Sequence, residues 1–280
     1  MDIKKILVPV DFSEHASYAL EVAAQWARQH GAEILVLHML GLFESSYELD
    51  ETSAMAEAKY YMKMAKKRFN EFLDKEYLEG ISVHRIVQNY KIFSELNQVA
   101  GEQDIDLIVM GSHGTSGIGG FFVGSNTEKV IRSAEVPVLV IKKQTPNFGI
   151  KEVVFACDFN LENESAYRKA MKLFQRLGAK VHLLYVNLPN TQFKSSTEIE
   201  EKMANFLFVV HDGKAVLNET PVCVCDHTIE MGIYRYCKKV NADLLAMPTH
   251  GRQGLSHFFR QSLAEDIANH IDLPVITFKI

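Results

Sequence analysis

An internal repeat constrains the fold of this chain more than any other feature of its sequence. Four short segments of the first half recur, in the same order, in the second half, which indicates a tandem duplication. The paired segments are 5–13 with 152–160, 30–39 with 177–186, 106–110 with 243–247, and 136–140 with 273–277. Whatever fold the first copy adopts, we therefore expect to find it twice.

Within each copy, apolar runs of strand length alternate with stretches of helical periodicity. This alternation predicts a mostly parallel sheet with helices on both faces. In the first copy we expect strands at 6–10, 34–40, 82–88, 107–110 and 137–141, and helices at 14–30, 54–77, 93–103 and 127–133. In the second copy we expect helices at 164–177, 196–211 and 229–240, and strands at 222–225 and 275–278. The predicted fold class is α/β, with two Rossmann-like domains that each hold an open sheet of five parallel strands.

Local signals fix some of the boundaries. Ser13 is expected to cap the first helix at its amino end, and Gly31 to end that helix in a left-handed conformation. Residues 143–149 contain Pro146 and Gly149 with little apolar content, which is typical of a linker. The predicted domains are therefore 1–143 and 150–280.

Composition limits the class of protein. The chain has 280 residues, of which 47% are hydrophobic and 23% charged, as in an ordinary globular protein with room for two cores. The net charge of −5 gives no general attraction to nucleic acid. No stretch approaches the length needed to span a bilayer, and the amino terminus enters a strand without an apolar leader. We therefore expect a cytoplasmic protein without nucleic-acid or membrane partners.

The four cysteines all fall in the second copy. Cys223 and Cys225 lie two apart in an apparent strand, so they share a face, and with His227 nearby they raise the alternative of a metal site. The spacing of paired zinc ligands is absent, so buried, reduced thiols are the favoured interpretation and no metal site is predicted.

A glycine-rich segment, 111–126, follows the apolar run 106–110 and precedes a helical pattern. Glycines between the carboxyl end of a strand and the amino end of a helix suit a phosphate, because the backbone can approach the anion and the first amides of the helix lack partners. Two simpler interpretations remain open. Ser125 and Glu128 have the spacing of a capping box, and the glycines could serve only to shape a loop.

The spacing of this segment is more specific than its composition. Gly111, two residues, Gly114, nine residues and then Gly124-Ser125 resembles the nucleotide-binding motif of the universal stress protein family. Neither a Walker A sequence nor a complete dinucleotide fingerprint is present. The resemblance covers nearly the whole chain as two fused copies, and it implies an adenine nucleotide alpha hydrolase-like fold that binds ATP across the carboxyl ends of the strands.

Carried over position by position, the resemblance implies a binding site for ATP, with or without Mg²⁺, in the first copy. The residues expected around adenine and ribose are Pro9, Val10, Asp11, Met39, Met110 and Gly111, and those expected to hold the phosphates are Gly114, Gly124, Ser125 and Asn126.

Two of the polar residues in this region have alternative explanations. The carboxylate of Asp11 could accept hydrogen bonds from the nucleotide, or could form the turn that leads into the first helix. His113 suggests acid–base catalysis, but no carboxylate partner is identifiable, and His250 recurs at the matching place in the second copy. We therefore assign His113 to loop structure and predict no catalytic residue.

The second copy departs from the motif. Pro248 stands at the place of the first glycine, and Gln261 at the place of the glycine before Ser262. Proline removes an N–H, and glutamine adds a side chain where the backbone would approach phosphate. We therefore expect the second copy to bind ATP weakly or not at all.

The resemblance implies a regulatory or protective, ATP-binding protein of the stress response. Its partners would be an adenine nucleotide and an unidentified protein, the two copies would pack as a pseudo-dimer within the chain, and whole chains could form a homodimer. The alternatives are a slow ATPase, for which no activating base or metal-carboxylate pair is identifiable, and a scaffold that has lost nucleotide binding.

Overall fold

The computed structural model describes residues 2–40, 51–88, 96–112, 125–189, 193–214, 221–249 and 273–280, with only the backbone described for 51–58 and 125. The chain divides into two compact units. The first unit contains the described residues within 3–112 and 125–148, and the second unit contains Asp2 and the described residues from 149 onward. Each unit corresponds to one copy of the repeat, and each is described by itself.

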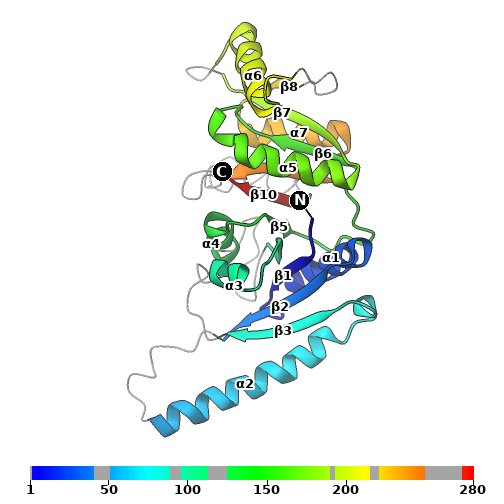
Figure 1. The fold of residues 1–280 in the computed structure, drawn as a ribbon, viewed down its shortest axis with the longest axis vertical. Helices are drawn as coiled ribbons and strands as arrows, with labels where there is room; N and C mark the ends of the chain where they lie inside the picture. The colour runs from blue at the N-terminus through cyan, green and yellow to red at the C-terminus, as the bar shows by residue number, and fades with distance from the viewer. Residues whose placement is uncertain are drawn as a thin grey trace. The chain divides into compact units, whose positions relative to one another are not determined.

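The first unit is built on a parallel sheet with the strand order β3-β2-β1-β4-β5 (Figure 1). Its strands are β1 Lys5–Pro9, β2 Glu33–Met39, β3 Val83–Gln88, β4 Leu107–Gly111 and β5 Val138–Ile141. Its helices are α1 Glu14–His30, α2 Glu51–Leu73, the short 3₁₀ helix η2 Glu76–Leu78, α3 Leu96–Glu102 and α4 Ser125–Ser133. Figure 1 shows α1 across the sheet from α3 and α4, as right-handed crossovers require.

The second unit repeats this arrangement with the strand order β10-β9-β6-β7-β8, again all parallel. Its strands are β6 Glu152–Ala156, β7 Lys180–Asn187, β8 Val222–Cys225, β9 Leu244–Thr249 and β10 Val275–Lys279. Its helices are the 3₁₀ helix η4 Leu161–Asn163, α5 Glu164–Leu177, α6 Ser196–Val210 and α7 Ile229–Val240. In Figure 1, α5 and α7 lie on opposite faces of the sheet. The predicted fold class, two α/β sheets of five parallel strands, is confirmed.

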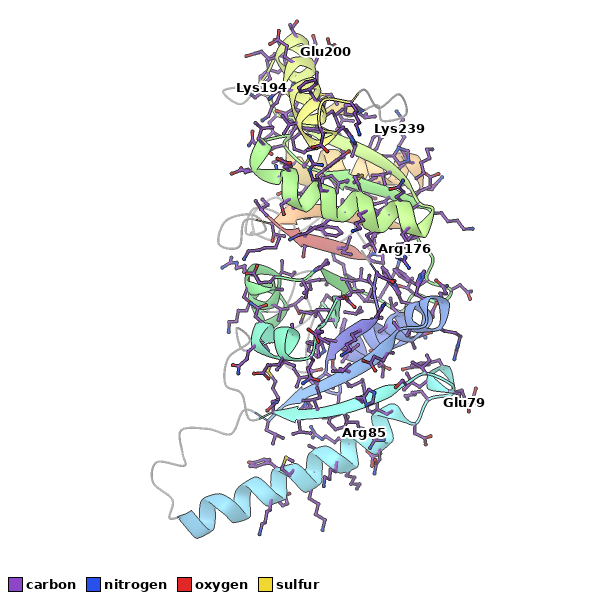
Figure 2. All side chains as sticks on the ribbon, in the orientation of Figure 1. Glu79, Arg85, Arg176, Lys194, Glu200 and Lys239 are labelled. Carbon is purple, nitrogen blue, oxygen red and sulfur yellow. The ribbon has the colours of Figure 1, made fainter. Side chains whose placement is uncertain are left out.

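Burial explains why the strands read as continuous apolar runs rather than as alternating patterns. The central strands β1 and β4 have helices on both faces, so that Leu107–Gly111 is buried at every position. Helix α1 packs on β1 and β4 through small residues, including Ala16, Ala19 and Ala23. The labelled charged residues Glu79, Glu200 and Lys239, in contrast, are exposed on the outer surfaces of their units (Figure 2).

The ends of the first helix follow the predicted cap chemistry in both copies. Ser13 accepts a hydrogen bond from the Ala16 amide at 3.2 Å, and Gly31 ends α1 with a φ of +67°. Gly178 ends α5 in the same way, with a φ of +66°. Because a left-handed C′ position favours glycine, the Gly-Ala dipeptide recurs after both helices.

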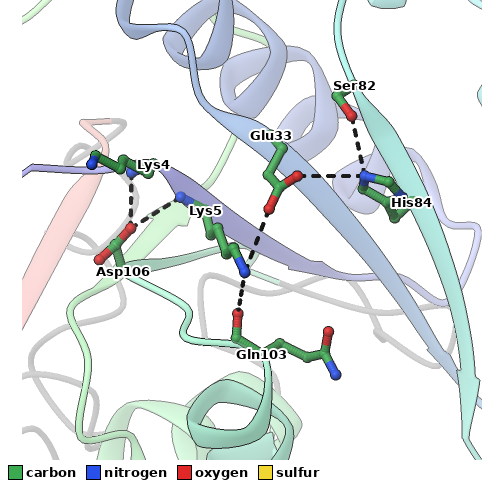
Figure 3. Close-up of polar contacts among 7 residues, drawn as sticks. All are labelled: Lys4, Lys5, Glu33, Ser82, His84, Gln103 and Asp106. Carbon is green, nitrogen blue, oxygen red and sulfur yellow. Dashed lines mark hydrogen bonds and ion pairs between the residues drawn. The ribbon is translucent and has the colours of Figure 1, made fainter.

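The amino ends of the strands hold a polar network that accounts for another part of the repeat (Figure 3). The Asp106 carboxylate accepts hydrogen bonds from the backbone amides of Lys4 and Lys5, at 2.8 and 3.0 Å. Asp243 accepts from the amides of Lys151 and Glu152 in the second copy, both at 2.9 Å. Each aspartate therefore fixes the start of the first strand of its unit. This lies at the amino ends of the strands, whereas the predicted nucleotide site lies at their carboxyl ends.

One ion pair between the first two strands occurs in both copies with the positions of its acidic and basic residues reversed. In the first unit, Lys5 on β1 pairs with Glu33 on β2 at 3.6 Å, as Figure 3 shows. In the second unit, Glu152 on β6 pairs with Lys180 on β7 at 3.5 Å. The basic residue lies on the first strand in one copy and on the second strand in the other. The contact is therefore repeated, although neither residue type is.

Two interpretations from the sequence need correction or refinement. Cys223 and Cys225 do share a face, but both are exposed, so the interpretation of buried thiols is wrong for this pair. The burial of the edge strand β8 alternates along its length, and Cys223 and Cys225 lie on its exposed face. Residues 145–148 of the expected linker pack on α1: Phe148 is buried, its amide donates to Gln25 Oε1, and its ring lies 6.0 Å from that of Trp26.

Among the described residues, no helix combines the length and apolar character needed to cross a membrane.

Candidate functional site

The carboxyl edge of the first sheet has a topological switch point between β1 and β4. From β1 the chain proceeds to β2 and β3 on one side, and β4 and β5 lie on the other. Loops diverge at such a point, and in open α/β sheets the resulting crevice is the usual place for a ligand. Six of the predicted site residues lie at the ends of β1, β2 and β4: Pro9, Val10, Asp11, Met39, Met110 and Gly111.

Asp11 takes part in the turn that joins β1 to α1. Its Oδ1 accepts a hydrogen bond from the Ser13 amide at 3.0 Å, and the intervening Phe12 has a φ of +65°. In the second copy, Asp158 accepts from the Asn160 amide at 3.0 Å across Phe159, whose φ is +56°. The alternative explanation for this aspartate, that it forms the turn before the first helix, therefore applies in both copies.

Phe12 contributes to an aromatic cluster beneath this edge of the sheet, which sequence reasoning missed. Its ring centroid lies 4.4 Å from that of His38, 5.2 Å from that of Phe69 and 5.5 Å from that of Phe72. His38 Nδ1 lies 2.8 Å from the Val10 carbonyl oxygen, to which its N–H donates. Burial lowers the pKa of His38, so the neutral ring that supports Val10 is favoured. The repetition of the Asp-Phe dipeptide in both copies was the sequence signal that could have pointed to Phe12.

Gly111 has a packing reason to be glycine that is independent of any ligand. A Cβ at this position would lie 2.7 Å from the backbone carbon and oxygen of His15. The amino-terminal turn of α1 therefore passes directly over the end of β4. Pro248 takes the corresponding place in the second copy, within β9 and beside Phe278 of β10.

Helix α4 begins at the same edge. The Thr127 side chain is buried, and its Oγ1 donates to the Gly111 carbonyl oxygen at 2.9 Å. This contact holds the first turn of α4 beside the end of β4. Ser125 and Asn126 are the first two residues of this helix, and Asn126 is exposed. Amides of a first helical turn lack intrahelical acceptors, so they are available to an anion.

The capping-box interpretation of Ser125 and Glu128 depends on the Ser125 side chain, which lies outside the described residues. The helix already includes Ser125, and the Glu128 carboxylate forms an ion pair with Arg132 one turn further on. Gly114, Gly124 and His113 lie outside the described residues, as do Gln261, Ser262 and His250 of the second copy.

The second unit contains a cavity of about 220 Å³ at its own switch point, between β6 and β9. The residues around it belong to the ends of β6, β7 and β9, to η4 and to the start of α7. Those that bear on its chemistry are Cys157, Asp158, Asn163, Tyr185, Ile233 and Pro248. A copy with a degenerate motif therefore retains a concave site at the edge where the intact copy is predicted to bind its ligand.

The cavity presents no thiolate. Burial raises the pKa of the Cys157 thiol to about 12, so this group is neutral at physiological pH. In the part of the chain that the structure describes, no group of three His, Cys, Asp or Glu residues could hold a metal ion, and this part includes Cys223, Cys225 and His227.

Comparison with known proteins identifies the family. The model of the universal stress protein family matches residues 2–142 and again residues 149–279. The chain belongs to the universal stress protein family. It contains two tandem copies of the universal stress protein domain, as the internal repeat predicts.

Single-domain relatives align with half of this universal stress protein. The universal stress protein MJ0577 of Methanocaldococcus jannaschii is 30% identical over 162 residues, which are 50% of this chain and 96% of the relative. The crystal structure of a universal stress protein from Archaeoglobus fulgidus covers 98% of this chain and 96% of its own, with a TM-score of 0.69 at 20% identity, and therefore shares the fold. A universal stress protein crystallised in complex with cAMP covers 51% of this chain and 98% of its own, at 22% identity and a TM-score of 0.32.

Proposed function

We propose that this universal stress protein binds ATP in its first copy and acts as a nucleotide-dependent regulatory or protective protein of the stress response. The observation that carries the proposal is the position of α4. Its first turn, with Ser125 and Asn126, is held by Thr127 beside the end of β4, where the glycine-rich segment connects the two elements. A triphosphate at this point would meet unpaired amides and the positive end of the helix dipole.

The nucleoside part of ATP would lie at the switch point. Val10 and Met110 supply apolar surface there, and Pro9 and Met39 are half-buried at the same edge. The Asp11 carboxylate would accept from ribose or from the adenine amino group while keeping its bond to the Ser13 amide, because a carboxylate has several acceptor positions. Gly111, Gly114 and Gly124 would allow the backbone to approach the ligand. Mg²⁺ would accompany the triphosphate through its phosphate oxygens.

The proposed role includes contact between copies and with other proteins. The second copy would act as the packing partner of the first, as an intramolecular pseudo-dimer, and would bind ATP weakly or not at all because of Pro248 and Gln261. A regulatory effect requires that ATP bind two states of the protein with different affinity. We propose an unidentified protein, or a second copy of the chain, as the reader of that difference.

The ligand carried by natively purified protein tests the proposal. We expect intact ATP, identified by mass and absorbance. Recovery of ADP with release of phosphate would instead indicate a slow ATPase, and absence of nucleotide even after addition of excess ATP would indicate a scaffold.

Substitutions in the glycine-rich segment locate the site. Gly114→Val and Gly124→Gln should each abolish ATP binding in calorimetric titration while the circular dichroism spectrum is unchanged, because each adds a side chain where the backbone approaches phosphate. Gln261→Gly is the matched control in the second copy, and it should create no second ATP site while Pro248 remains. Unchanged affinity in both first-copy variants would refute the assignment.

A further inference from the structure

Two helices expose apolar side chains on the face that points away from the core of their own unit. Helix α2 lies beside the edge strand β3 with Ala65 and Phe69 buried, and α6 lies beside α5 with Phe206 buried (Figure 1). Among the described residues, most of the exposed large apolar side chains lie on these two helices. They are Tyr60, Tyr61, Met62 and Met64 on α2 and Phe208 on α6. Exposed apolar groups that gather on one element and are bordered by polar residues mark a contact surface.

On α2, one exposed strip combines apolar groups with positive charge. The strip follows the spacing i, i+3, i+4, i+7, which places its members on one face over two turns of helix. Its members are Tyr60, Lys63, Met64 and Lys67, and all four are exposed. Both of its charged residues are therefore basic, although the chain as a whole has a net charge of −5.

On α6, an exposed strip has the same spacing and the opposite charge. Its members are Glu201, Ala204, Asn205 and Phe208, again all exposed. The Phe208 side chain is 64% exposed and the Tyr60 side chain of α2 is 60% exposed, so neither ring is covered by its own unit. Glu200, next to this strip, adds a second carboxylate on the outer surface (Figure 2).

The two strips match when the helices run antiparallel. Tyr60 then lies opposite Phe208, which pairs two aromatic rings. Lys67 lies opposite Glu201, because each helix separates its aromatic residue from its charged residue by seven positions, about 10.5 Å of helix. A parallel alignment would instead place an aromatic ring beside a charged group at both ends. The chemistry of the strips therefore fixes the direction of the contact.

The central positions agree with the same register. Met64 would lie opposite Ala204, a large side chain against a small one, as close helix packing favours. Lys63 would lie opposite Asn205, whose amide oxygen can accept a hydrogen bond from the ammonium group. Pairing of α2 with another α2 would instead bring the lysines of two strips together, which repel each other. Charge complementarity thus selects α6 as the partner of α2.

We propose that the outer face of α2 docks antiparallel on the outer face of α6 in a second copy of the chain. A two-fold axis makes the contact twice, since α6 of the first chain then meets α2 of the second. Helices α2 and α6 occupy the same place in the two copies of the repeat, each between the second and third strands of its sheet. No residue of the proposed ATP site takes part, so the contact is independent of nucleotide binding.

Analytical ultracentrifugation of the full chain, without added nucleotide, tests this proposal. At about 100 μM chain and about 50 mM salt we expect dimers, and at about 500 mM salt a dissociation constant larger by about threefold or more, because salt screens the charged contacts. Lys67→Glu and Glu201→Lys should each weaken dimerisation by about tenfold or more, since each places like charges opposite one another twice per dimer. Lys239→Glu, on the exposed surface of α7, is the matched control and should dimerise as the wild type does.

A mixture of the two weakened variants identifies the contact. When Lys67→Glu and Glu201→Lys chains are combined in equal amounts, we expect mixed dimers with a dissociation constant within about threefold of the wild-type value. In a mixed dimer, one contact joins the two substituted residues and the other joins the two native ones, so both again bring opposite charges together. A contact between α2 and α6 of the same chain would gain nothing from mixing.

Three results would each overturn the proposal: a wild-type chain that is monomeric at about 100 μM, a dimer that neither substitution weakens, or no dimer in the mixture. Monomeric chains that bind vesicles of anionic phospholipid would assign the lysines of α2 to a membrane surface instead. The first result needs no substitution, so it remains decisive if a variant fails to fold.

Discussion

Thr127 and Gly111 join α4 to β4: the buried Thr127 hydroxyl donates to the Gly111 carbonyl oxygen over 2.9 Å. Gly111 begins the glycine-rich segment and Thr127 follows it, so this one bond joins the end of the strand to the start of the helix on which the proposed phosphate site depends. A hydroxyl at this position therefore matters both to the fold and to the binding of a nucleotide.

Thr127→Val should separate these contributions. The substitution keeps the shape of the side chain but leaves a buried carbonyl oxygen without its donor, which costs about 1–3 kcal/mol. We expect a lower midpoint of urea denaturation and weaker ATP binding in calorimetric titration. Thr127→Ser retains the hydroxyl and should preserve ATP binding. Full ATP affinity in Thr127→Val would show that this hydrogen bond does not position the site.

Gly111→Ala tests the close approach of α1 to β4. The new methyl group would lie 2.7 Å from the backbone of His15, so one of the two elements must shift, at a cost of about 1–3 kcal/mol. Gly101→Ala is a matched control, because Gly101 lies within α3 and a Cβ there meets no atom within 4 Å. This second change should stabilise the protein by about 0.5–1 kcal/mol. Thermal unfolding of the two variants should therefore shift in opposite directions.

The aspartates at the amino ends of the strands give a third prediction. Asp243 Oδ2 accepts from two backbone amides, and Asp106 does the same in the first copy. Replacing either by alanine should lower stability by about 1.5–3 kcal/mol, because each accepting group is charged, whereas asparagine should cost less since it keeps an acceptor oxygen. Neither change should affect ligand binding at the opposite edge. Hydrogen exchange of the Lys5 and Glu152 amides would show the loss directly, and protection equal to that of the wild type would contradict the prediction.

Local chemistry made much of this fold predictable from the sequence. Helix α1 spans Glu14–His30 as expected, because Ser13 and Gly31 determine its ends within a few residues. Tertiary relationships were harder to foresee. The shared face of Cys223 and Cys225 follows from strand periodicity, but its exposure depends on what packs against that face of β8. Likewise, nothing local to Gly111 indicates that His15 lies against it.

The common position of several candidate residues at the strand ends was predictable from the sequence, whereas the packing around them was not. The duplicated strand ends placed Pro9, Val10, Met110 and Gly111 at one edge because parallel strands of a sheet share their carboxyl edge. The aromatic cluster under that edge depends on α2, whose Phe69 and Phe72 reach Phe12 across a long stretch of sequence. Helical spacing could predict that these apolar side chains share one face of the helix, but not that Phe69 lies beside His38.

The neutral His38 of this cluster makes stability depend on pH. Burial lowers the pKa of His38 in the folded protein, while the unfolded chain keeps a value of about 6.5. As the pH falls through about 6.5, the unfolded state therefore takes up a proton that the folded state does not, so the contribution of His38 is complete above this pH and is lost below it. His38→Tyr introduces the residue that the second copy has at the matching position, Tyr185, which also packs against a phenylalanine of its Asp-Phe turn. In urea denaturation between about pH 5 and pH 8, we expect the stability of the variant relative to the wild type to increase as the pH falls. A difference that stays constant over this range would show that His38 does not carry the effect.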